Sequence, residues 1–73
     1  MAVITTAEDA IETGDVFLSK YYPFKRPLSA KIEEENWLVV FDVGAIKVQR
    51  VGLKIDANTG AILEVDDLSN HDT

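Results

Sequence analysis

The sequence has no cysteine and a single histidine among its 73 residues. Without cysteine there are no disulfides, no thiolate nucleophile and no thiolate metal site. The histidine, His71, is the third residue from the end, and a catalytic triad needs a rigid base oriented by a buried carboxylate, which the end of a chain does not supply. We therefore expect no catalytic residue, no metal site and no cofactor, and we expect that the protein is not an enzyme.

Positive charge is also scarce. Seven Lys and Arg residues stand against thirteen Asp and Glu, which gives a net charge of −6. Such a charge repels phosphate backbones and anionic lipid, so we expect neither nucleic acid nor a membrane as partner. No segment approaches the ~20 apolar residues of a membrane span, and the N-terminus lacks a basic region followed by an apolar run. A protein partner or self-association is expected, with a cytoplasmic location.

The length and composition predict one small folded domain. Hydrophobic residues make up 47% of the chain, which is enough for a core, although a domain of this size buries only ~60% of its unfolded surface. We place the domain at residues 1–66 and a polar, acidic tail at residues 67–73.

The first third of the sequence predicts a helix. Thr5 and Glu8 have the spacing of a capping box, in which each side chain binds the backbone amide of the other. An apolar stripe follows at helical spacing and consists of Ala7, Ala10, Ile11, Gly14, Phe17, Leu18 and Tyr21. Gly14 lies within this stripe, so we expect the helix to approach a sheet closely there. Pro23 ends the helix.

The remainder predicts four strands in an antiparallel meander, and hence an α+β fold with one helix packed on the sheet. We expect the strands at residues 28–32, 37–43, 46–56 and 61–65, with a turn at 34–36 and a two-residue hairpin turn at Gly44 and Ala45. Ile46 and Val48 are out of phase with the rest of the third strand. A bulge near Gln49 and Arg50 would bring them onto the face that the helix covers.

The segment from Asp56 to Gly60 predicts a turn between the last two strands. Asp and Asn side chains bind nearby backbone amides, and Gly60 can adopt a positive φ. The spacing Asp56-x-Asn58-x-Gly60 also resembles the first half of a calcium loop, but the later ligands and the bidentate glutamate are missing. The turn is the favoured interpretation, and calcium binding is the alternative.

Alternation along the predicted strands leaves four apolar side chains on the sheet face opposite the helix, namely Leu38, Val40, Leu63 and Val65. One helix cannot cover both faces of a sheet. We therefore expect this open face, or a strand edge, to bind a protein partner. The alternative is a structural homodimer or subunit that buries the same face.

Two segments resemble a known family. Residues 4–11, ITTAEDAI, are similar to the capped opening helix of PepSY domains, which occur in propeptides of thermolysin-like metallopeptidases and as separate modules. Residues 53–63, LKIDANTGAIL, are similar to that family's last strands and the turn between them. The resemblance spans about residues 3–65 and brings no catalytic residues. It implies a small regulatory or inhibitory binding module.

Overall fold

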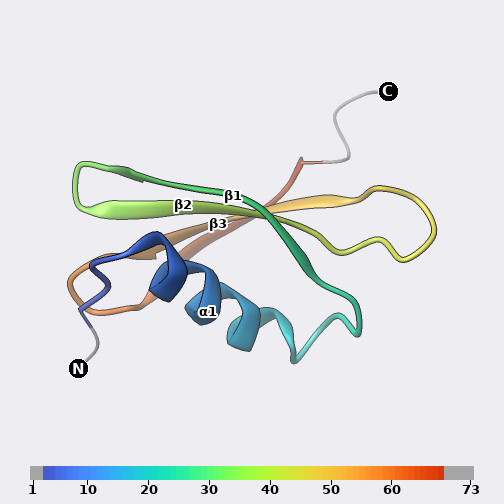
Figure 1. The fold of residues 1–73 in the computed structure, drawn as a ribbon, viewed down its shortest axis with the longest axis horizontal. Coiled ribbons are helices and arrows are strands. Elements are labelled where there is room, and N and C mark those ends of the chain that lie inside the picture. The colour runs from blue at the N-terminus through green and yellow to red at the C-terminus, as the bar shows by residue number, and fades with distance from the viewer. Residues whose placement is uncertain (1–2, 69–73) are drawn as a thin grey trace.

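The computed structural model describes residues 3–68 and contains one helix and one sheet. The elements are α1 (Ala7–Leu18), β1 (Arg26–Glu33), β2 (Asn36–Asp42), β3 (Arg50–Asp56) and β4 (Ile62–Asp67). The strands lie in the order β1-β2-β3-β4 and every neighbouring pair is antiparallel. The helix lies on one side of the sheet (Figure 1). The predicted α+β meander is therefore confirmed.

The helix begins one residue later than the sequence suggests. Thr6, not Thr5, is the N-cap, and its hydroxyl accepts a hydrogen bond of 3.1 Å from the Asp9 amide. Ile4 is fixed on both sides, because its amide donates to the Ala57 carbonyl and its own carbonyl accepts from Trp37 Nε1 at 3.0 Å. This anchoring of Ile4 on the sheet leaves Thr6 at the point where the chain turns into the helix.

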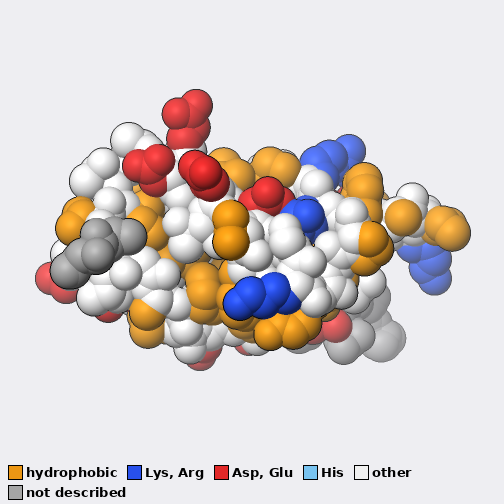
Figure 2. Space-filling model, turned by 90° about the horizontal axis from the view of Figure 1, so that it is seen from below, with side chains coloured by type: hydrophobic (Ala, Val, Ile, Leu, Met, Phe, Trp, Pro, Cys, Tyr) orange, Lys and Arg blue, Asp and Glu red, His pale blue; other side chains and the backbone are white. Residues whose placement is uncertain are grey.

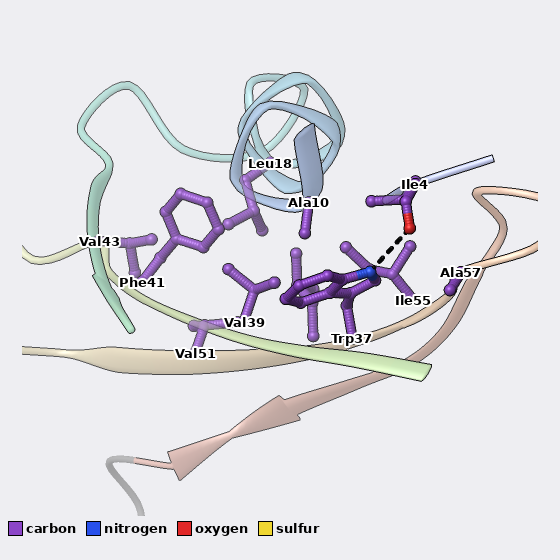
Figure 3. Packing of buried hydrophobic residues seen from close by; sticks show 11 residues of the cluster. Ile4, Ala10, Leu18, Trp37, Val39, Phe41, Val43, Val51, Ile55 and Ala57 are labelled. Carbon is purple, nitrogen blue, oxygen red and sulfur yellow. Dashed lines mark hydrogen bonds between the residues drawn. The ribbon is translucent and has the colours of Figure 1, made fainter. Parts of the chain in front are cut away.

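The core lies between α1 and the facing side of β2 and β3 (Figure 3). Phe41, Leu18, Leu53, Ile55, Val39 and Val51 are the largest side chains that are fully buried there. Gly14 lies at the closest approach, as predicted, since a Cβ on this residue would be 2.8 Å from Phe41 Cε1 and 2.9 Å from Leu53 Cδ1. Even an alanine methyl group would therefore crowd these two side chains.

The predicted connection between the second and third strands is wrong. The chain does not turn at Gly44 and Ala45, and β3 does not begin until Arg50. Residues 43–49 form a loop that projects from one end of the molecule, drawn in yellow at the right of Figure 1. Ile46 and Val48 are therefore in the loop and exposed, so the bulge that was expected to bring them to the core is not needed.

Both outer strands of the sheet carry a bulge. The register of β1 skips Leu28, and the register of β4 skips Leu63. Bulges and charged side chains are common protections against unwanted pairing at sheet edges. β4 ends at Asp67, one residue into the predicted tail, and the tail from residue 69 onwards, with His71, lies outside the described residues.

Candidate functional site

The loop at residues 43–49, here called the β2–β3 loop, is organised by the carboxylate of Asp42. Asp42 Oδ1 accepts hydrogen bonds from the Gly44 amide at 3.0 Å and from the Gln49 amide at 3.1 Å. The Val43 amide donates to the Gln49 carbonyl at 2.8 Å. Both ends of the loop are thus bound to one carboxylate and to each other. The base of the loop is a fixed part of the sheet's end.

Asp42 is the only buried charged residue between residues 3 and 68, with 3% of its surface exposed. The two backbone amides of Gln49 and Gly44 favour the ionised form and hold the pKa of this carboxyl below its usual value, despite the opposing effect of burial. Arg26 of β1 adds an ion pair, with its guanidinium 3.0 Å from Oδ2. Both carboxylate oxygens are therefore occupied by protein donors, which is the arrangement of a structural anchor.

Gly44 is required by the same geometry. A Cβ on Gly44 would overlap the Lys47 carbonyl oxygen, which is a backbone atom and cannot swing aside as a side chain does. The loop therefore folds back on itself tightly near its start.

The tip of the β2–β3 loop presents apolar side chains to water. Ile46 is 96% exposed and Val48 is 65% exposed, with Lys47 between them. Figure 2 shows orange side chains and a blue one gathered on this projecting end, while most of the red side chains on the visible face lie toward the other end. Loops held by a rigid scaffold are common sites of binding. This anchored apolar tip is the strongest candidate site among the described residues.

The four residues predicted to bind a partner do not share one face. Leu38 and Val40 are half-buried on the outer face of β2, beside Gly52 and Leu68. Leu68 partly covers that face, because a Cβ on Gly52 would lie 3.3 Å from Leu68 Cδ1. The surrounding positions on β1 and β4 carry polar or charged side chains, so the apolar part of this face is small.

Val65 lies on the opposite face. It pairs with the core residue Leu53, and it lines a pocket of about 340 Å³ whose other walls are Phe17, Leu18, Tyr21 and Tyr22. The expected position of Val65 on the open face is therefore wrong. The cause is the bulge at Leu63, which shifts the alternation of β4 by one residue. Leu63 itself is 49% exposed at this bulge.

A second groove lies between the N-terminal segment and α1. Its volume is about 420 Å³ and its lining includes Val3 and Val16, each 61% exposed, together with the acidic side chains Asp9 and Glu12. Asp9, Glu12 and Val16 recur at helical spacing and so share one side of α1. The groove therefore combines apolar walls with carboxylates.

The turn after β3 differs from the β2–β3 loop because its exposed side chains are polar. The Asp56 carboxylate accepts from the Asn58 amide at 2.8 Å, and Gly60 has a φ of 79°, as predicted. The Asn58 side chain donates to Glu35. Among residues 3–68 no group of three or more His, Asp or Glu side chains is arranged to hold a metal ion.

Asp42 is the residue that the sequence analysis misses. Its local signal is Asp-x-Gly directly after an apolar strand, the pattern of a side chain that binds the amide two residues on. Asp56 makes the same kind of bond, to the Asn58 amide, and it is readable because Asn58 and Gly60 follow it and a strand pattern lies on each side of this short turn. The bond to Gln49, seven residues on, has no signal in the sequence.

A scan against models of known protein families gives no match for this chain, and searches of curated proteins and of solved structures find no significant match either. No helix within residues 3–68 has the length and apolar character that a membrane crossing requires.

Proposed function

We propose that this domain is a non-enzymatic protein-binding module that presents the β2–β3 loop to its partner. The observation that carries the proposal is the exposure of Ile46 on a loop whose base is anchored by the buried Asp42 carboxylate. A two-residue turn would suffice to join two antiparallel strands. Here the connection has seven residues and is anchored by the buried Asp42 carboxylate, and it exposes the apolar side chains of Ile46 and Val48 to water.

The energetic scale of the tip fits a recognition element. Burying an aliphatic side chain of this size is worth ~1.5–3 kcal/mol. Ile46 and Val48 are both largely exposed in the isolated domain, so most of that free energy is still available for binding. The fixed base lowers the entropy that is lost when the loop docks.

The resemblance to PepSY domains supports a regulatory or inhibitory role for such binding. Membership of that family is a hypothesis based on the two similar segments, and it does not identify which residues of this chain contact a partner. The loop and the resemblance together favour a module that binds another protein and alters its activity, with a location in the cytoplasm as part of the same proposal.

The proposal is tested by placing a photo-crosslinking residue, benzoylphenylalanine, at position 46. The matched control carries it at position 31, where the Lys31 side chain is also well exposed but lies on β1. Irradiation in an extract of the cells that make the protein should give a discrete adduct from position 46 that Lys47→Glu weakens. An absence of adducts, or the same adducts from both positions, would contradict the role of the loop.

The outer sheet face offers a second surface for the same class of function. Leu38 and Val40 border a depression of about 180 Å³, and this surface could bind a partner or a second copy in a structural homodimer. Val40→Asp should then abolish association while the domain stays folded, as measured by sedimentation and circular dichroism. Association that survives Val40→Asp but not Ile46→Asp assigns binding to the loop alone.

A further inference from the structure

The groove between the N-terminal segment and α1 has a definite chemical preference. Val3 and Val16 form exposed apolar walls, and Asp9 and Glu12 place carboxylates beside them. A side chain that fills this groove should be aliphatic, and it should be followed or preceded by a cation that can reach the carboxylates. The occupant is therefore expected to be a short segment in which apolar and basic residues adjoin.

The tip of the β2–β3 loop has this composition. Ile46 and Val48 flank Lys47, and all three lie at the projecting end of the molecule. The groove includes Val3, and the segment that leads from Val3 into α1, drawn in blue, lies toward the other end of the long axis in Figure 1. The chain thus carries both halves of a complementary contact, and in this structure no residue of the β2–β3 loop lines the groove of its own molecule.

We infer that the loop tip of one molecule docks into the groove of a second copy, with Ile46 between Val3 and Val16 and with Lys47 beside Asp9 and Glu12. This inference rests on the proposed role of the loop and names its partner. The contact is small compared with the ~1,200 Å² of a stable complex, so it forms transiently at high protein concentration.

Charge acts on this contact in two opposing ways. Each copy has a net charge of −6, so two copies repel one another at long range. At physiological salt this repulsion is screened beyond about 8 Å, whereas a pair of opposite charges that docking partly buries is screened much less. Association is therefore expected to strengthen when salt is raised from very low to physiological concentration.

Two variants separate the halves of the contact. Ile46→Asp removes the loop tip and leaves the groove intact, and Val16→Lys blocks the groove and leaves the loop intact. Both positions are largely exposed, so both variants should fold. Each variant alone should associate more weakly than the wild type by a factor of about ten or more. A mixture of the two should associate, because it still contains one intact loop and one intact groove.

The readout is the NMR spectrum of ¹⁵N-labelled Val16→Lys. Unlabelled Ile46→Asp should shift the amide signals of residues 45–48, and unlabelled Val16→Lys should leave them unchanged. The reverse labelling should shift the signals of Asp9 to Val16. Shifts absent in the mixture, or confined to the outer face, would overturn the inference. If the loop signals do not respond to a second copy but position 46 crosslinks to a different protein, the inference fails while the proposed function stands.

Discussion

The connections after β2 and after β3 begin with the same local hydrogen bond but present different surfaces, one apolar and one polar. After β2, Asp42 binds the amide of Gly44; after β3, Asp56 binds the amide of Asn58. In each case an aspartate at the end of a strand binds the amide two residues on. The first connection then presents Ile46 and Val48, whereas the second presents the exposed polar residues Asn58 and Thr59.

The difference lies in what else the aspartate binds. Asp42 is buried, and it also accepts from the Gln49 amide and from Arg26. Asp56 makes its one side-chain bond in a turn that the φ of Gly60 then closes, with the Gly60 amide donating to the Asp56 carbonyl. One carboxylate holds the two ends of a long loop together, and the other only starts a short turn. An anchored long loop can carry exposed apolar residues without losing its shape.

The largest expected effect is that of Asp42→Ala. It would leave the part-buried Gly44 and Gln49 amides without their acceptor and would also remove the ion pair with the exposed Arg26 side chain. Three interactions are lost together, and a donor shielded from water without a partner costs more than the net value of one hydrogen bond. Asp56→Ala removes one bond and should cost ~0.5–1.5 kcal/mol. Urea unfolding of the two variants should show the greater loss for Asp42→Ala. Equal losses would mean that the two aspartates are equivalent and that the base of the β2–β3 loop is not anchored.

The contribution of Asp42 should also depend on pH. The pKa of Asp42 is lowered in the folded protein, so its ionised form contributes stability above the unfolded pKa of about 3.9, and that contribution is lost as pH falls through the folded pKa. The wild type should therefore be more stable than Asp42→Asn at pH 7, and the gap should close below about pH 4. Thermal unfolding measured from pH 7 to pH 3 tests this, and a gap that stays constant would rule out the charge as the cause.

The comparison also explains which parts of the structure are readable from the sequence. The helix, the close approach at Gly14 and the turn at Gly60 are each predicted from a pattern of residues a few positions apart, although Gly14 itself contacts distant residues of the sheet. The helix ends at Leu18, so the predicted stripe is wrong at Tyr21, which lies beyond α1 and is 63% exposed. The β2–β3 loop depends on a bond from Asp42 to Gln49 and on Arg26 from another strand. Ile46 and Val48 alternate like strand residues, so the sequence pattern places them in β3. The bulge at Leu63, which turns Val65 to the helix side, leaves no sequence signal either.

Gly60 provides an intermediate effect. Its φ of 79° lies in the left-handed region, where a β-branched residue is strained and asparagine is tolerated. Gly60→Val should cost about 1–3 kcal/mol, and Gly60→Asn should cost much less. Chemical denaturation of both variants measures the difference. If the two lose the same stability, the positive φ is not what selects glycine at this turn.

The smallest expected effect on stability comes from making the two connections alike at their tips. Ile46→Ser with Val48→Ser gives the β2–β3 loop a polar tip like that of the turn after β3. Both side chains are mostly in water, so the free energy of unfolding should change by less than about 0.5 kcal/mol. The Asp42 carboxylate should keep its bonds, and the amide signals of Gly44 and Gln49 should stay in place.

Binding, by contrast, should be lost in this variant. Because position 46 is now mutated, the benzoylphenylalanine crosslinker is placed at position 45 in both the wild type and the variant. The adduct that forms with the wild type should be absent from the variant. A fall of more than about 1 kcal/mol would show that Ile46 and Val48 stabilise the isolated domain, and the loop would then be part of the fold and not a surface presented for binding.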